Sequence, residues 1–477
     1  MPVKLPWLKG VFPALVTPFD NEEGVDEKAL RGLVNYVIDD VDGLVPCGTT
    51  GEFPYLSVEE QKRVVEIVTR EVKGKKPVIA GTCAAGTYQV INLVENAKEA
   101  GADACLIVTP YFLHPSPKGI YQHFYKIAKT IDIPIIMYNI PQTVNAYLPR
   151  EVVEDLADIP NIVGLKDSSG NLAYTMEVME MVQGKIDVLI GHDEVVLPAL
   201  AGGCSGMILA SAQVFPEIWQ KIYADVQENH LEVARSYQMK IQKLARIFVR
   251  YGGGLAVKAA LNMMGIKVGK ARRPLKIGGS LIHEVRAEIQ LELEKLGKIK
   301  PANVKFSPPR DELESRFSDI GLSPQVIREE SLRLGTGVFG NGLEKVQLDL
   351  IRGSKKSSLG FAYAFQLTHP RHGHEALTAI LEPNLAVRPP ALIVPTVELK
   401  NLRQANMVYG PTQTAVAKAI ADNLASGLIP TQAMDEEVIL VKTTVHPRAL
   451  DRHLLYNNVY QAMQEVIKQA FSLQEAK

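Results

Sequence analysis

Eight short apolar runs, rich in β-branched residues, recur along the chain between residues 10 and 212. They are GVFPALVTPF (10–19), DGLVPCGTTGE (42–52), PVIAGTCAAG (77–86), ADACLIVTPY (102–111), IPIIMYNIP (133–141), IVGLKDSS (162–169), VLIGHD (188–193) and GMILASA (206–212). The runs are continuous and do not alternate with polar residues, which is typical of parallel strands buried on both faces. The stretches between them have helical spacing. One of them, residues 57–74, begins on a serine with Glu60 three residues later, the pattern of a capping box.

Eight successive strand–helix units predict an α/β fold, a closed (β/α)₈ TIM barrel. A doubly wound open sheet is the main alternative, but such a sheet normally stops at fewer strands. The sequence therefore favours the barrel.

The pattern changes after residue 300. Residues 301–324 are rich in proline and charge and weak in periodicity, which indicates a domain break around a mostly irregular connector with one short helix near 324–333. We expect a barrel domain at 1–300, a linker at 301–330 and a second domain at 331–477.

The second domain has its own pattern of elements. Its apolar runs predict strands at 343–353, 376–384, 390–399 and 436–447, and helical spacing predicts helices at 413–430 and 454–471. This is the pattern of a separate α+β domain, large enough to fold alone.

The composition of the chain argues against several classes of function. The 477 residues are 46% hydrophobic and 22% charged with a net charge of −1, so nothing indicates binding to nucleic acid or to an anionic membrane. No apolar run approaches the length of a membrane span, and the proline-containing N-terminus lacks the apolar core of a signal peptide. The four cysteines form no CxxC pair, which favours reduced, buried thiols and a cytoplasmic protein.

Candidate chemistry lies at the strand ends, because the C-terminal ends of barrel strands carry the active site. Those ends hold Thr17, Thr49, Thr50, Glu52, Tyr111, Tyr138, Lys166, His192, Asp193 and Ser211. The run IVGL ends in Lys166, and an ammonium group at the tip of a buried strand is costly unless it is used or neutralised. Burial favours the neutral, nucleophilic amine. A lysine, a tyrosine that moves protons and a threonine turn that holds a carboxylate would suit Schiff-base chemistry on a 2-oxo acid.

Each of these residues also has an ordinary structural explanation. A lysine at a strand end is more often a surface group, YNIP can be a strand end with turn residues, and GTTGE can be a helix cap. Only their expected convergence favours an active site.

The motifs CGTTGE (47–52), TPYF (109–112), YNIP (138–141) and GLKDSSGNL (164–172), in this order and spacing, resemble the dihydrodipicolinate synthase / N-acetylneuraminate lyase family from about residue 8 to 295. The resemblance implies a barrel with extra C-terminal helices, here 215–250 and 255–296. It also implies a class I aldolase or lyase without a metal or other cofactor.

The resemblance assigns a role to five residues. It implies that Lys166 forms a Schiff base with pyruvate or another 2-oxo acid, that Tyr138 donates and accepts protons, and that Thr49 relays them. Thr50 resembles the threonine that binds the carboxylate of pyruvate, and Ile208 matches a backbone contact to the bound keto acid.

Two departures concern the second substrate. Members that make dihydrodipicolinate carry an arginine shortly after the YNxP motif, where this chain has Thr143. A neutral threonine cannot replace a bidentate guanidinium. Phe112 stands where the synthases usually carry an interface tyrosine, so the relay through that hydroxyl is lost. An aldol reaction between pyruvate and an unknown aldehyde is therefore better supported than dihydrodipicolinate synthesis.

Two motifs in the second half suggest cofactors that their context does not support. GTGVFGNG (335–342) contains GxGxxG but precedes a strand and not a helix, so it lacks the context of a dinucleotide site. HPRHGHE (369–375) gathers three histidines, but no cysteine or suitably spaced partner histidine reinforces a metal site, and a solvated loop is favoured.

LEPNLAVRPPALIV (381–394), YGPTQTAVAKAIAD (409–422), GLIP (427–430) and VHP (445–447) resemble the formaldehyde-activating enzyme, a tetrahydromethanopterin hydro-lyase, over about residues 335–471. The resemblance places the active histidine at Gln347, keeps Asp349 and Gln413, and puts Thr396 and Glu398 where a lysine and a threonine are expected to contact the pterin.

Glutamine cannot act as a general acid, which argues against formaldehyde activation at the family's rate. Tetrahydromethanopterin stays open as a ligand of this domain, as does an altered ligand or a regulatory and assembly role.

Three hypotheses follow for the whole chain. It is a bifunctional enzyme that passes formaldehyde between an aldolase and a carrier, an active lyase with a binding or oligomerisation module, or a protein with relic motifs. A genuine 4-hydroxy-tetrahydrodipicolinate synthase is the alternative for the barrel. Barrel relatives are usually dimers of dimers and formaldehyde-activating enzymes form five-membered rings, so we expect a homo-oligomer.

Overall fold

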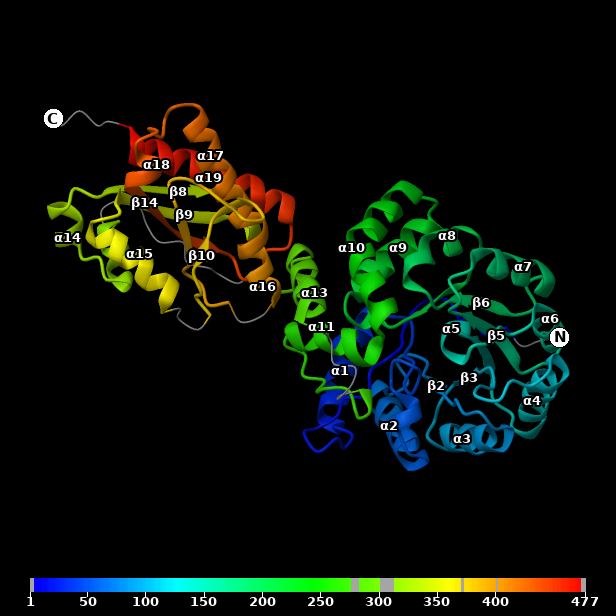
Figure 1. Cartoon of the computed structure of the whole chain (residues 1–477). Helices are drawn as coiled ribbons and strands as arrows, with labels where there is room; N and C mark the ends of the chain where they lie inside the picture. Colours follow the sequence, from blue (N-terminus) through cyan, green and yellow to red (C-terminus); the bar gives the residue numbers. More distant parts are fainter. Residues whose placement is uncertain (1–3, 276–282, 301–312, 370–372, 400–401, 473–477) are drawn as a thin grey trace. The chain divides into compact units, whose positions relative to one another are not determined.

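The computed structural model describes residues 4–275, 283–300, 313–369, 373–399 and 402–472. The chain divides after Lys300 into two compact units, shown in Figure 1. The segment 301–312, which belongs to the expected connector, lies outside the described residues.

The first unit is built on a parallel sheet. Its strands are β1 (Gly10–Pro13), β2 (Ile79–Gly81), β3 (Ala104–Val108), β4 (Ile135–Asn139), β5 (Ile162–Asp167), β6 (Asp187–Ile190) and β7 (Gly206–Leu209). They pair in parallel in the order β1-β7-β6-β5-β4-β3-β2. The predicted barrel fold is therefore confirmed, with all seven strands inside predicted apolar runs or within one residue of them.

The run at 42–52 does not form a full strand, although it closes the barrel. Val45 makes a parallel bridge to Ala14, and Leu44 makes one to Val78, so this short segment joins the β1 edge to the β2 edge. The segment stops pairing early because the backbone turns at Cys47 and Glu52, both in the left-handed region with φ of 58° and 60°.

Helices surround the sheet (Figure 1). They include α1 (Glu27–Val37), α2 (Val58–Val72), α3 (Thr87–Glu99), α4 (Pro117–Thr130), α5 (Pro141–Val144), α6 (Arg150–Leu156), α7 (Leu172–Val182), α8 (Val196–Ala201), α9 (Pro216–Gln227), α10 (Leu231–Tyr251), α11 (Lys258–Met263) and α13 (His283–Lys295). The predicted capping box at the start of α2 is present, with Ser57 and Glu60 exchanging hydrogen bonds. Of the expected C-terminal helices, residues 276–282 lie outside the described part of the chain.

The second unit has one mixed sheet in the order β10-β13-β14-β9-β8. These strands are β8 (Arg333–Phe339), β9 (Val346–Ser354), β10 (Leu377–Thr378), β13 (Ala391–Pro395) and β14 (Glu437–Val445), and a separate hairpin joins β11 (Ile380–Glu382) to β12 (Leu385–Ala386). The pair β13–β14 is parallel and the others are antiparallel. This confirms the separate α+β domain.

Helices cover both faces of that sheet. One apolar cluster joins it to α17 (Gln413–Ala425) and α19 (Arg452–Phe471), and another joins its other face to α15 (Ser358–Thr368), α14 (Pro324–Glu329) and the 3₁₀ turn Glu314–Ile320. Residues 313–332, expected in the connector, thus pack on the second unit.

The segment 335–342 was assigned no structure from sequence, and most of it is strand β8. A Cβ atom on Gly335 would lie 2.2 Å from the Val466 carbonyl oxygen, so glycine is needed where α19 crosses the strand. Helix α15 was also missed, because its exposed Phe361 and Phe365 blur the apolar face. None of the described helices is both long and apolar enough to cross a bilayer.

Candidate active site

Lys166 and Tyr138 lie at the ends of adjacent strands. They are register partners of β5 and β4, and partners in a parallel pair point to the same side of the sheet. Both side chains are buried, with 4% and 2% of their surfaces exposed. The Lys166 Nζ atom lies 4.1 Å from the centroid of the Tyr138 ring. The lysine therefore contacts the face of the phenol.

Thr49 extends this arrangement. Its Oγ1 atom lies 3.4 Å from the Tyr138 hydroxyl, a long hydrogen bond in which either atom can donate. The turn that carries Thr49 is held by Thr17, whose hydroxyl donates to the Gly51 carbonyl at 2.7 Å. Thr49 and Tyr138 are thus linked through their hydroxyls, and Lys166 contacts the Tyr138 ring. We call Lys166, Tyr138, Thr49 and Thr50 the lysine site.

Thr50 is 9% exposed, and its hydroxyl has no hydrogen-bond partner among the described residues. The helical turn Gly253–Val257 packs directly behind it. A Cβ atom on Gly253 would come within 2.2 Å of the Thr50 Cγ2 atom, so only glycine permits this approach. The position of Thr50 therefore depends on a segment two hundred residues further along the chain.

A buried ion pair anchors the same turn. The Lys258 Nζ atom lies 2.7 Å from Glu52 Oε1, and both side chains are almost fully buried. Burial raises the pKa of Glu52 and lowers the pKa of Lys258 to about 8, although each partner opposes the shift of the other. The Arg272 backbone N–H donates to Glu52 Oε2 at 2.9 Å, and its guanidinium pairs with Glu60 at 2.7 Å.

Lys166 and Lys258, both buried in the first unit, differ in their partners. Lys258 is paired with Glu52, whereas Lys166 has no hydrogen-bond or ion-pair partner among the described residues apart from the Tyr138 ring. A buried amine without an ion-pair partner is available for chemistry.

The loop after β5 is fastened by Asp167. Its carboxylate accepts hydrogen bonds from Asn139 Nδ2 at 2.9 Å, from the Ser169 N–H and hydroxyl at 3.0 Å, and from Thr175 Oγ1 at 2.6 Å. Asn171 then caps α7. The polar residues that follow Lys166 in the sequence thus fix the strand end that carries it.

The structure places the other expected barrel residues as follows. Ile208 lies on β7, 1% exposed, in the inner apolar cluster that also contains Tyr138. Thr143 is exposed within α5 and carries no charge. Phe112 is 88% exposed and has a φ of 73°, so an aromatic side chain is held out in a backbone conformation that is unusual for it.

In the second unit, Gln347 and Asp349 lie two residues apart on β9, so their side chains are neighbours on the same face of the sheet. Gln347 Nε2 donates to both Asp349 carboxylate oxygens at 3.3 Å, and its own Oε1 atom is buried without a hydrogen-bond partner in the described part of the chain. Asp349 also accepts from Thr336 Oγ1 at 2.7 Å and pairs with Arg316 at 2.7 Å. We call Gln347, Asp349, Thr336 and Arg316 the β9 site.

Sequence reasoning missed Arg316. It comes from the 3₁₀ turn Glu314–Ile320, and with 12% exposure of its side chain it pairs with an Asp349 side chain of 6% exposure. Phe317 and Ile320 in the same turn are buried. The spacing of these two apolar residues was the one sign that the turn packs on a domain.

Gln413 is not part of the β9 site. It opens α17, where its Nε2 atom donates to the Thr378 carbonyl at 2.8 Å. Of the three second-domain residues expected at one site, Gln347 and Asp349 touch each other, and Gln413 makes no described contact with either.

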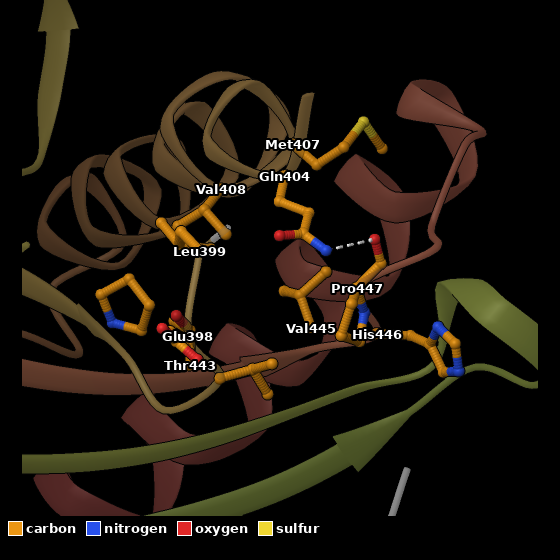
Figure 2. A pocket seen from close by; sticks show the side chains of 11 residues that line it. Glu398, Leu399, Gln404, Met407, Val408, Thr443, Val445, His446 and Pro447 are labelled. Carbon is orange, nitrogen blue, oxygen red and sulfur yellow. Dashed lines mark hydrogen bonds between the residues drawn. The ribbon is translucent and has the colours of Figure 1, made fainter. Parts of the chain in front are cut away.

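Figure 2 shows a cavity of the second unit, lined among others by Glu398, Thr443 and His446, with Gln404 Nε2 donating to the Pro447 carbonyl at 3.2 Å. Its volume is about 10 Å³, near the smallest that holds one water molecule.

The histidine-rich segment is only partly described, because residues 370–372 lie outside the described residues. The His369 ring stacks on Phe365 with centroids 4.4 Å apart, and His374 Nδ1 lies 2.9 Å from the Pro395 carbonyl oxygen. Each of these two rings has a structural partner.

A closed parallel barrel with a buried, unpaired lysine beside a tyrosine at its strand ends defines the first unit as a class I, Schiff-base lyase. The comparisons with known proteins agree. The chain belongs to the Dihydrodipicolinate synthetase family, which matches residues 7–296. Residues 334–475 match the Formaldehyde-activating enzyme, and the second unit is a domain of that kind. Both resemblances found in the sequence are confirmed.

Several similar proteins match the barrel. The 4-hydroxy-tetrahydrodipicolinate synthase of Geotalea daltonii is 39% identical over 268 residues, which are 56% of this chain and 92% of the relative. The same enzyme of Methanopyrus kandleri is 38% identical over 293 residues, 61% of this chain and 97% of the relative. The dihydrodipicolinate synthase of Acinetobacter baumannii, solved as a complex with pyruvate, is 34% identical and aligns with a TM-score of 0.59 over 61% of this chain and all of its own.

Proposed function

We propose that the barrel joins Lys166 to pyruvate or a related 2-oxo acid as a Schiff base and makes or breaks an aldol bond to a small aldehyde. The observation that carries this proposal is the Lys166 amine, buried, without a counter-ion among the described residues and 4.1 Å from the Tyr138 ring. The relative solved with pyruvate supports the choice of keto acid.

The proposed steps use the described side chains. The Lys166 amine adds to the ketone carbon, and Tyr138 transfers a proton to the departing oxygen, which leaves as water. The protonated imine withdraws electrons, so loss of a C3 proton or cleavage of the C3–C4 bond yields an enamine. Thr49, 3.4 Å from the Tyr138 hydroxyl, relays protons to and from it. Hydrolysis of the imine returns the free amine.

Thr50 binds the carboxylate of the keto acid. Its hydroxyl lacks a partner among the described residues, and backbone N–H groups of the same turn add hydrogen bonds to an anion. Ile208 on β7, in the inner apolar cluster that also contains Tyr138, offers a backbone contact to the keto acid.

The relatives' names favour a second candidate, 4-hydroxy-tetrahydrodipicolinate synthesis. Thr143 and Phe112 argue against it, because the first cannot form a bidentate pair with a carboxylate and the second has no hydroxyl. An assay for 4-hydroxy-tetrahydrodipicolinate with the purified chain decides between the two. Turnover comparable to that of the relatives would replace our choice of substrate and keep the Schiff base.

For the second unit we infer a retained fold without formaldehyde activation, acting as a binding or oligomerisation module. Gln347 has no proton to donate as an acid, and the neighbouring Asp349 is occupied by Arg316 and Thr336. Tetrahydromethanopterin is the ligand to test, by binding and by its condensation with formaldehyde. A condensation rate above background would contradict the inference.

Borohydride trapping tests the barrel directly. Reduction in the presence of pyruvate should add the mass of a reduced pyruvyl group to the peptide that contains Lys166, and Lys166→Ala should abolish both trapping and turnover. A chain ending at Lys300, with lyase turnover unchanged and assembly altered, would support the module. If no mass is added to the native chain, the Schiff-base proposal is wrong.

A further inference from the structure

Helix α15 of the second unit, labelled in Figure 1, carries a row of aromatic rings on its surface. Phe361 and Phe365 are 74% and 44% exposed, and their ring centroids lie 6.4 Å apart at an interplanar angle of 23°. His369, which directly follows the helix, stacks on Phe365 at 4.4 Å and 9°. Exposed aromatic side chains gathered in this way indicate an interaction site.

The same three rings line a cavity of about 610 Å³, which we call the α15 cavity. Residues 319–321 also line it, so it lies between α15 and the end of the 3₁₀ turn Glu314–Ile320. Cavities that hold one small organic molecule typically measure about 300–1,000 Å³. The α15 cavity is therefore large enough for one ligand.

One polar side chain of the α15 cavity is buried without a partner. Gln366 lies on the inner face of α15, where the other buried residues, Leu359 and Ala362, are apolar and helically spaced. Gln366 is 6% exposed, lines the cavity and has no hydrogen-bond partner among the described residues. Burying an amide without a hydrogen bond is costly. An apolar residue would suit this position better unless the amide binds a ligand.

Two other polar side chains of the α15 cavity are already paired. The Asp319 carboxylate forms an ion pair with Lys442 at 2.6 Å, and the Ser358 hydroxyl donates to Glu330 at 2.5 Å. No arginine or lysine lines the cavity among the residues that the structure describes. The cavity thus lacks the cations that bind phosphate or carboxylate groups, and it favours an uncharged ligand.

We propose that the α15 cavity binds an uncharged, flat heteroaromatic ring of the purine type, which stacks on the aromatic side chains of α15 and forms two hydrogen bonds with Gln366. This inference rests on the proposed role of the second unit as a binding module, and it gives that module a ligand class. Exposed aromatic side chains are the usual stacking partners of such rings. A glutamine amide presents an acceptor beside its donors, which matches a ring with an amino group next to an acceptor nitrogen, as in adenine.

Two nucleosides that differ by one amino group test the proposal. Adenosine carries the amino group beside the acceptor nitrogen, and purine riboside lacks that amino group. Calorimetric titration of the full chain should show that adenosine binds about tenfold more tightly than purine riboside, the usual effect of leaving one buried polar group unpaired. Adenosine monophosphate should bind no more tightly than adenosine, because no arginine or lysine lines the described cavity.

Three variants separate the amide from the aromatic rings. Gln366→Leu removes the amide at similar side-chain size and should bring the two affinities close together. Phe361→Ala, at a highly exposed position where folding is not at risk, should weaken both nucleosides by about fivefold or more and keep their ratio. Phe339→Ala is the matched control, because this exposed phenylalanine of β8 does not line the cavity, and both affinities should stay native.

Equal affinities of the native chain for the two nucleosides, an unchanged ratio in Gln366→Leu, tighter binding of adenosine monophosphate, or no binding of adenosine at millimolar concentration would overturn the proposal. Dissociation of a native oligomer in Phe361→Ala, measured by sedimentation velocity, would also overturn it and assign the rings to a second copy of the chain.

The condensation of formaldehyde with tetrahydromethanopterin is measured on the same samples. Absence of both adenosine binding and condensation refutes the ligand class alone, whereas condensation above background refutes the role of the second unit as a binding module.

Discussion

The lysine site and the β9 site both contain buried polar residues at positions where the two family resemblances predict an active site, and they differ in the hydrogen-bond and ion-pair partners of those residues. Lys166 contacts an aromatic face and has no ion-pair or hydrogen-bond partner in the described structure, whereas Asp349 is held by an arginine, a threonine and an amide. Burial alone therefore does not identify a working site. The unpaired Lys166 amine indicates chemistry, and the saturated Asp349 carboxylate indicates structure.

Tyr138→Phe should give the largest effect. Loss of the hydroxyl removes the proton transfer between Thr49 and the reacting oxygen, and kcat should fall by about 10²- to 10⁴-fold. Steady-state turnover of the aldol reaction with pyruvate measures it. Tyr125→Phe, on the outer helix α4, is the control and should keep native kcat. A loss of less than threefold in Tyr138→Phe would show that the lysine site does not depend on the Tyr138 hydroxyl for catalysis.

Arg316→Met tests whether the β9 site stabilises the second unit. The change leaves the buried Asp349 without its cation and should lower the free energy of unfolding of the second unit by about 3 kcal/mol. Arg388→Met removes a pair whose side chains are 61% and 78% exposed, and should cost less than about 0.5 kcal/mol.

The two units can be followed separately in this measurement. Both tryptophans, Trp7 and Trp219, belong to the first unit, so tryptophan fluorescence in urea reports the barrel and far-UV circular dichroism reports both units. Equal stability of Arg316→Met and the native chain would show that the β9 site is not held by this pair.

Gly253→Ala should have an intermediate effect on the lysine site. The new methyl group would meet Thr50 Cγ2, so we expect KM for the 2-oxo acid to rise about tenfold as the carboxylate loses a hydrogen bond. Gly32→Ala is the control, because nothing lies within 4 Å of a Cβ atom at that helical position. An unchanged KM in Gly253→Ala would show that Thr50 does not bind the carboxylate of the 2-oxo acid.

Gln347→Leu should give the smallest effect. The side chain is buried with one unpaired oxygen and two long hydrogen bonds, so an apolar replacement of similar shape should change the free energy of unfolding by less than about 1 kcal/mol in either direction. Chemical denaturation measures it. Strong destabilisation would show that the Gln347 amide makes hydrogen bonds that stabilise the second unit, which contradicts this prediction.

The barrel was predictable because its strands are continuous apolar runs and its motifs stand at their ends. The expected strand at 42–52 was wrong in length, since left-handed residues at Cys47 and Glu52 turn the chain soon after Val45. Single residues in αL leave little trace in a hydrophobic pattern. The convergence of Lys166, Tyr138 and Thr49 was expected from strand order, and the distances between them could come only from the structure.

The second unit was harder to predict, for two physical reasons. The glycines of β8 match the spacing of a dinucleotide-binding motif without its context, whereas Gly335 is needed because α19 lies directly over it. Arg316 lies in a segment whose prolines and charges indicate a connector, and its partner Asp349 follows 33 residues later, so no local pattern joins them. Long-range ion pairs of this kind cannot be predicted from the hydrophobic periodicity of the sequence.

The Glu52 carboxylate draws together parts of the chain that are made at very different times. Its partners are the ammonium of Lys258 and the backbone N–H of Arg272, the latter 220 positions away. A nascent chain on the ribosome carries the threonine turn long before it carries these anchors. The turn acquires its final support only when α11 and the residues after it have emerged, so the last part of the barrel to be synthesised completes the first part of its active site.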